Sequence, residues 1–164
     1  SLEIAYTYVM RLSFFSLAAF FVVTFAVAAI GSFATMSSIE TWYMTLNKPA
    51  LNPPNWVFGP VWTLLYAFMA VAAWRVYQSS SHLKVYALAM YAVQLLLNLA
   101  WSFAFFRYEH PLLALQVILA LLFAISITAV LFYRSDRLAG ILFVPYILWV
   151  SFATYLNAAI VSLN

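Results

Sequence analysis

The sequence predicts an all-α membrane protein, a bundle of five transmembrane helices with a long ordered loop between the first and second helices. Hydrophobic residues make up 68% of the 164 residues and charged residues only 7%, and the mean hydropathy is +1.01. A soluble domain of this length cannot bury so much apolar surface, so its solvent must be lipid. Apolar runs of about 20 residues indicate helices, whereas the strands of a barrel would alternate over about 10 residues.

We expect a single transmembrane domain over residues 1–164. The first helix should run from about residue 11 to 33, after a lead-in that is either interfacial or a helical extension. The small side chains of this helix indicate an ordinary helix-packing face. The other four helices are expected at about 56–78, 83–106, 111–133 and 138–162, the last one kinked by Pro145.

The stretch from Trp42 to Tyr66 is the most unusual part of the chain, because it holds four of the six prolines and three of the six tryptophans. Each proline fixes its own φ and moves the preceding residue out of the helical region. The loop over residues 34–55 is therefore stiff. A loop this long is uncommon unless it is functional or disordered, and its composition favours order. We interpret its part from Trp42 to Asn55 as a lid.

The charges predict the topology of the bundle, because five spans put the two termini on opposite sides. The N-terminal side collects most of the basic residues, and the other side has two. The positive-inside rule then predicts a cytoplasmic N-terminus and places the first loop on the opposite side of a membrane that the sequence does not identify. The basic residues on the N-terminal side are Arg11, Arg75, Lys84, Arg134 and Arg137, and those on the other side are Lys48 and Arg107.

The usual catalytic constellations are missing from the sequence. There is no cysteine, and His82 and His110 fall in turns on opposite sides, so no metal site is expected. The four acidic residues lie in turns or helix ends, which leaves no carboxylate for a proton relay within the membrane. Three glycines form no phosphate loop, and a net charge of +3 indicates membrane ends and no nucleic-acid partner.

Aromatic and amide side chains recur at helical spacing on three of the expected helices. Amides at membrane depth need partners, so these stripes should face the bundle or a cavity. Such a set suits a flat, conjugated ligand held by stacking, although ordinary core packing is the alternative for any single tryptophan. Trp42 and Tyr43 could instead form an interfacial belt. The stripes contain Trp62 and Tyr66, then Gln94, Asn98, Trp101 and Phe105, then Tyr146, Trp149, Ala153 and Asn157.

Five short motifs combine tryptophan, tyrosine, proline and amides in a fixed order along the chain. They are WY-x-x-L-x-KP (42–49), PP-x-W (53–56), W-x-x-LY (62–66), Q-x-x-x-N-x-x-W (94–101) and VPY-x-x-W-x-x-FAT-x-LN (144–157). Together they resemble the translocator protein family, whose members are also called tryptophan-rich sensory proteins or peripheral benzodiazepine receptors. The resemblance covers nearly all of the chain beyond the first helix.

The resemblance implies a five-helix bundle, often a homodimer, with a ligand pocket capped by the first loop. Family ligands are porphyrins such as protoporphyrin IX, cholesterol in animal members, and synthetic benzodiazepine-like or isoquinoline drugs. Trp62 and Trp149 match tryptophans implicated in light-dependent porphyrin breakdown by some bacterial members. Tyr155 is followed by no lysine or arginine, so the sterol-recognition pattern of animal members is incomplete. Other matched pocket positions are Tyr43, Asn98, Trp101, Ala153 and Leu156.

These observations lead to one hypothesis and two alternatives. The protein is expected to bind a porphyrin or haem-like tetrapyrrole without a covalent bond, in a sensory or transport role in tetrapyrrole or stress regulation. The first alternative is an enzyme that degrades porphyrin with light and oxygen, with Trp62 and Trp149 as its catalytic residues. The second is a small passive transporter of hydrophobic ligands or sterols. The predicted binding residues are Trp42, Tyr43, Pro49, Trp62, Tyr66, Asn98, Trp101, Tyr146, Trp149, Ala153 and Leu156.

Overall fold

The computed structural model describes residues 2–164, which form seven α-helices and one π-helical turn. Ser1, where the predicted domain begins, lies outside the described residues. Within residues 2–164 there is no strand, so the all-α prediction is confirmed. The elements are α1 (Leu2–Met36), α2 (Trp42–Thr45), α3 (Asn55–Gln78), α4 (Lys84–Ser102), the π-helical turn η1 (Phe103–Arg107), α5 (Pro111–Ser135), α6 (Arg137–Leu142) and α7 (Val144–Leu163).

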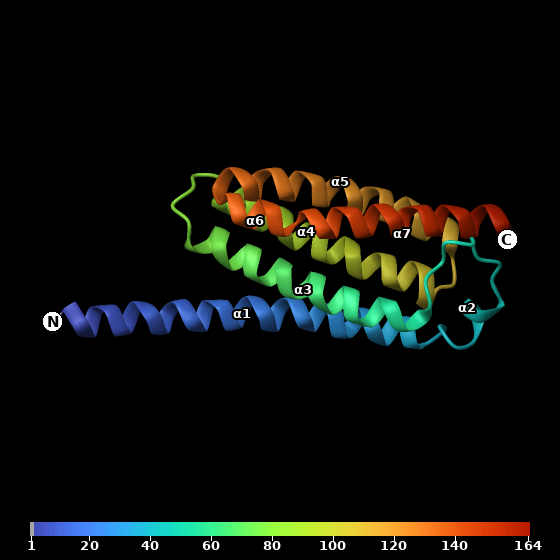
Figure 1. Ribbon diagram of the computed structural model, residues 1–164, viewed down its shortest axis with the longest axis horizontal. Coiled ribbons are helices and arrows are strands. Elements are labelled where there is room, and N and C mark those ends of the chain that lie inside the picture. Colours follow the sequence, from blue (N-terminus) through green and yellow to red (C-terminus); the bar gives the residue numbers. More distant parts are fainter. Residues whose placement is uncertain (1) are drawn as a thin grey trace.

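The helices form an elongated bundle with five segments long and apolar enough to cross a membrane, as predicted (Figure 1). The N- and C-termini lie at opposite ends of this bundle. The loop that contains α2 caps the end at which α7 finishes. The long loop and the N-terminus are therefore on opposite sides, and the prediction that the N-terminal side is cytoplasmic rests on the basic residues alone.

Helix α1 begins at Leu2, well before the predicted start near residue 11. The lead-in is thus a helical extension of the first span. Residues 2–10 contain no proline or glycine that would stop a helix, and Thr7 Oγ1 donates to the Glu3 carbonyl at 2.9 Å. At 1.5 Å per residue, α1 is about 52 Å long, well beyond a hydrocarbon thickness of about 30 Å. Its first turns project past the other helices (Figure 1).

Prolines set the starts of three helices. Pro54, with ψ of 147°, is extended and leads into α3, as predicted from the stiff loop. Pro111 occupies the first turn of α5. The expected helix 138–162 is interrupted at Phe143, between α6 and α7, which agrees with the kink predicted at Pro145 because Phe143 itself keeps helical dihedrals, with φ of −83° and ψ of −16°. Pro145 sits in the first turn of α7, where its missing N–H removes no intrahelical hydrogen bond.

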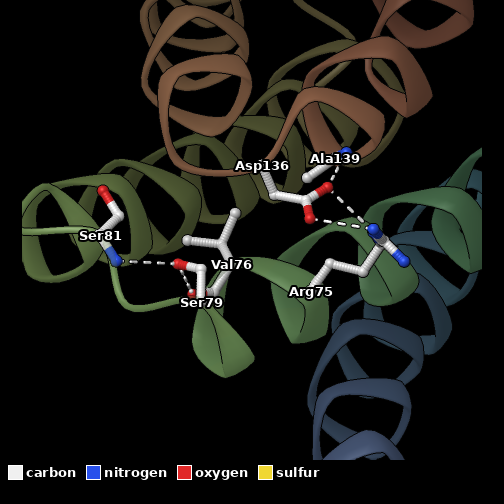
Figure 2. A network of polar contacts seen from close by, with 6 residues as sticks. All are labelled: Arg75, Val76, Ser79, Ser81, Asp136 and Ala139. Atoms are coloured by element: carbon white, nitrogen blue, oxygen red, sulfur yellow. Dashed lines mark hydrogen bonds and ion pairs between the residues drawn. The ribbon is translucent and has the colours of Figure 1, made fainter.

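An ion pair fixes the end of the bundle opposite the lid (Figure 2). Arg75 of α3 donates two hydrogen bonds of 2.9 Å to the carboxylate of Asp136, which lies between α5 and α6. The same carboxylate caps α6 by accepting the Ala139 N–H at 2.9 Å. The hydrogen-bonded Arg75 guanidinium holds the pKa of Asp136 below its ordinary value. One side chain thus connects α3 to the turn between α5 and α6.

Gly140 allows α6 to fold back closely against the end of α5. A Cβ built at this position would lie 2.6 Å from the Cα of Tyr133, a distance that real Cβ atoms do not reach. The core that this turn helps to close mixes aliphatic and aromatic side chains, and its fully buried members include Met69, Val76, Phe132 and Phe143. This packed half of the bundle forms the base on which the functional site rests.

Candidate functional site

A cavity of about 510 Å³ lies under the long loop, surrounded by α1, α3, α4 with η1, and α7. Its volume falls inside the range of about 300–1,000 Å³ that is typical of small-molecule sites. Most of its lining is apolar and aromatic. Eight of the eleven predicted binding residues lie on its wall, namely Tyr43, Trp62, Tyr66, Asn98, Trp101, Trp149, Ala153 and Leu156.

Three predicted binding residues lie off the cavity wall, and their part in binding stays a prediction. Trp42 packs edge-on against Phe105, with 5.6 Å between ring centroids, and so lies behind the wall. Pro49 belongs to the lid but does not reach the cavity. Tyr146 is fully buried among core residues. Tyr146 supports the wall from below.

Helix α1 supplies a whole wall that the sequence did not predict. Its small side chains, which we interpreted as an ordinary packing face, line the cavity together with Phe25 and Met36. At Gly31, a Cβ would lie 3.4 Å from Ser102 Oγ, an ordinary van der Waals distance, so α1 and α4 pack directly against each other here. The small residues on this wall are Ala28, Ala29, Gly31, Ser32 and Thr35.

The aromatic part of the wall is centred on Trp62. Its ring centroid lies 5.7 Å from that of Tyr66 and 6.4 Å from that of Trp101, and each pair is tilted by 32°. Trp149 faces in from α7 and packs edge-on against Phe58 at 6.0 Å. These distances are normal for aromatic pairs. The cavity is thus bordered by indole and phenol rings from three helices.

A chain of polar contacts forms the floor of the cavity. Tyr66 donates from its hydroxyl to Asn98 Oδ1 at 3.0 Å, and Asn98 Nδ2 donates to the Tyr146 hydroxyl at 2.7 Å. That hydroxyl donates in turn to Gln94 Oε1 at 2.8 Å, and Gln94 Nε2 lies 3.8 Å from the sulfur of Met69. Both amides, which were expected to need partners at membrane depth, find them within this chain of contacts.

Two indole N–H groups on the wall differ in their hydrogen bonding. Trp101 Nε1 donates to Asn157 Oδ1 at 3.1 Å, and Asn157 Nδ2 donates to the Pro111 carbonyl at 2.8 Å, which ties α4, α7 and α5 together. Trp149 Nε1 is buried and has no acceptor among the described residues. An unpaired buried donor is costly, so this N–H is the polar group of the two that lacks a partner within residues 2–164.

The π-helical turn η1 was not predicted and shapes one corner of the cavity. The Tyr108 N–H donates to the Phe103 carbonyl at 2.8 Å, five residues back instead of four. Turns of this kind occur frequently at functional sites. Here the neighbouring residues Phe105 and Phe106 both reach the wall, with 4.8 Å between their ring centroids.

The lid is ordered by contacts at both of its ends. Tyr43 is buried, and its hydroxyl donates to Asn52 Oδ1 at 3.2 Å across the loop. Burial raises the pKa of Tyr43. Lys48 Nζ lies 4.7 Å from the centre of the Tyr43 ring, within the range of a cation–π contact. The Asn47 N–H donates to Asn164 Oδ1 at 2.9 Å, and Asn164 Nδ2 donates to the Asn47 carbonyl at 2.9 Å.

Known proteins resemble this chain over most of its length. The TspO/MBR family matches residues 20–163. A tryptophan-rich protein TspO of Archaeoglobus fulgidus is 40% identical over 139 residues, which cover 85% of this chain and 90% of that protein. A tryptophan-rich sensory protein of Cereibacter sphaeroides is 41% identical over 140 residues, with 84% and 87% covered. The translocator protein of Homo sapiens is 38% identical over 119 residues, with 71% and 70% covered. This integral membrane protein therefore belongs to the TspO/MBR family.

Proposed function

We propose that the protein binds planar hydrophobic tetrapyrroles of the protoporphyrin IX type in the cavity beneath the lid, in a sensory or transport role. The observation that carries this proposal is a cavity of about 510 Å³ whose wall contains three tryptophans, Trp62, Trp101 and Trp149. Flat conjugated rings gain most from stacking against other aromatic faces. A relative in Cereibacter sphaeroides bears the name tryptophan-rich sensory protein, which is in keeping with a sensory role.

The polar groups on the wall fit the proposed ligand as well. An apolar pocket needs only a few polar groups to orient its ligand. Trp149 Nε1 is a donor without an acceptor among residues 2–164, and the Asn98 amide keeps one further N–H beyond the one that it gives to Tyr146. A tetrapyrrole with an acidic edge would supply acceptors for both, while its ring stacks on Trp62.

Titration of protoporphyrin IX into the purified protein tests the proposal. Saturable quenching of tryptophan fluorescence and a shift of the main porphyrin absorbance band are expected. The double variant Trp62→Phe, Trp149→Phe should bind about tenfold more weakly or worse, since each phenyl ring offers a smaller stacking face than the indole and no N–H donor. Trp56→Phe is the matched control, because Trp56 is exposed and off the wall. Equal affinity of the double variant and this control would eliminate the proposed site.

A second function is favoured by the presence of Trp62 of α3 and Trp149 of α7 around the same cavity. A bound porphyrin excited by light would contact both indoles, so either could serve as an electron or radical partner while oxygen acts as the oxidant. Illuminated mixtures should then give a new bilin-like absorbance that disappears in the double variant. Loss of porphyrin at the same rate with free tryptophan or with detergent alone would show that the protein does not catalyse this reaction.

A further inference from the structure

The cavity is not closed by protein on every side. Six residues on its wall are also exposed, three from α1 and three from α3. On each helix their spacing of three or four residues puts them in one row on one face. The row on α1 is Ala29, Ser32 and Met36, and the row on α3 is Asn55, Gly59 and Thr63.

The two rows lie opposite each other along one edge of the bundle. Helices α1 and α3 pack side by side in opposite directions (Figure 1). Near the other end of the pair, Trp74 Nε1 of α3 donates to the Ser13 carbonyl and to Ser16 Oγ of α1, each at 3.2 Å. Both helices rise about 1.5 Å per residue. Fifteen residues closer to the lid, Gly59 is therefore level with the stretch of α1 that contains Ala29.

Space is open beside Gly59, where the cavity wall meets the surface of the bundle. A Cβ built on Gly59 would meet no heavy atom within 4 Å, even though Gly59 belongs to a helix that packs on α1. The residues of α1 that line the cavity at this level, Ala29 and Ser32, are small. We name this gap, lined by Ala29, Ser32, Gly59 and Thr63, the α1–α3 slit.

A ligand that entered the cavity beneath the lid would meet a larger barrier than one that entered through the slit. It is held by the Tyr43–Asn52 hydrogen bond and by two hydrogen bonds between Asn47 and Asn164. Opening the lid would break these contacts together, whereas passage through the slit needs no hydrogen bond to break. Gly59 lies about 6 Å along α3 from its first residue, which puts the slit near the interfacial level of the lid-side leaflet.

We propose that the α1–α3 slit is a lateral portal through which a planar amphiphile dissolved in the lid-side leaflet reaches the cavity. The proposal rests on the tetrapyrrole-binding function proposed above. At this depth, the acidic edge of a tetrapyrrole stays among the lipid headgroups while its ring slides edge-on between α1 and α3. The small residues along the slit set the thickness of the ligand that passes.

Stopped-flow binding of protoporphyrin IX to the protein in phosphatidylcholine nanodiscs tests the portal. Gly59→Leu and Ala29→Leu narrow the slit, so association and dissociation should both slow by about tenfold while the Kd changes less than about threefold. Gly59 precedes Pro60 inside α3, where a Cβ on the preceding residue disfavours the helical conformation, so Ala29→Leu tests the slit without this strain. Ala26→Leu is the matched control, since Ala26 is exposed on the same helix and lies off the cavity wall. It should leave both rates unchanged.

Two results would overturn the portal without touching the proposed function. The first is unchanged rates in both slit variants. The second is a higher Kd caused by faster dissociation alone, which would mean that the new side chains only fill the binding space. Absence of saturable binding in the unaltered protein would instead refute the proposed function itself. Melting curves of all three variants show that any slowing does not come from misfolding.

Discussion

Removal of the Tyr146 hydroxyl tests whether the hydrogen bonds beneath the cavity stabilise the bundle. It accepts from Asn98 Nδ2 at 2.7 Å and donates to Gln94 Oε1 at 2.8 Å, and the whole side chain is buried. In Tyr146→Phe the ring stays in place and only the oxygen is lost. One donor on Asn98 and one acceptor on Gln94 are then left without a partner in the membrane interior.

The size of the effect follows from these two groups. An unsatisfied buried polar group costs about 1–3 kcal/mol in soluble proteins. Hydrogen bonds between membrane helices average only about 0.6 kcal/mol, with a maximum of about 1.7. Asn98 keeps its bond from Tyr66, and Gln94 keeps its contact with the sulfur of Met69, so neither side chain is stripped completely. We therefore expect Tyr146→Phe to lower the free energy of unfolding by about 2 kcal/mol.

Unfolding in mixed micelles with rising denaturing detergent, followed by helical circular dichroism, measures this loss. Tyr155→Phe is the control on the same helix, because Tyr155 is 46% exposed and should change the unfolding free energy by less than about 0.5 kcal/mol. If Tyr146→Phe is no more destabilising than Tyr155→Phe, the polar floor does not hold the helices together as described here.

Two further predictions concern the end of the bundle opposite the lid. Gly140→Ala should destabilise the protein by about 1–3 kcal/mol, because the new Cβ would meet the backbone of Tyr133, and an unchanged melting temperature would contradict this packing. The pKa of Asp136 is lowered by Arg75 in the folded state, so the ion pair contributes stability above the ordinary carboxyl pKa of 3.8 and loses it as the pH falls through the lowered value. Unfolding midpoints measured down to acidic pH should therefore fall less steeply in Asp136→Asn, and parallel pH profiles would argue against a stabilising pair.

Composition and hydrophobic run length were sufficient to predict the fold class, the five spans and the helix starts set by prolines. The first helix was placed too far along because Arg11 was taken as its boundary, whereas a helix without proline or glycine simply continues back to Leu2. The kink near Pro145 was predicted, but its position at Phe143 was not. Local sequence locates a proline, but the packing of α6 on α5 through Gly140 decides how far the chain turns there.

The sequence predicted which face of each helix points toward the candidate site, but not how far the cavity extends along that face. Helical spacing groups residues on one face, and it does not say where along that face a cavity ends. Trp149 and Ala153 line the cavity, while Tyr146, one turn away on the same face, belongs to the core. On α4, Asn98 likewise lines the cavity, while Gln94, one turn away, is buried in the core. The floor lies where Tyr66, Asn98 and Tyr146 bond to one another, a contact among three helices that one helix cannot reveal.

The wall from α1 could not be predicted for a different physical reason. Alanine, glycine and serine on a membrane helix allow another helix to approach, and the same small side chains also leave room for a ligand. Gly31 does the first, through its close approach to Ser102 of α4. Ala29 and Ser32, on the same stretch, do the second. Only the position of α3 relative to α1 distinguishes the two uses.

Determination of the structure with protoporphyrin IX bound tests the central proposal most directly. The tetrapyrrole should occupy the cavity of about 510 Å³, with its ring against Trp62 and an acceptor within hydrogen-bonding distance of Trp149 Nε1. The lid should remain bound to Asn164, as it is without ligand. A tetrapyrrole found on the outer surface of the bundle, with the cavity unoccupied, would contradict the proposed function and the portal that leads to it.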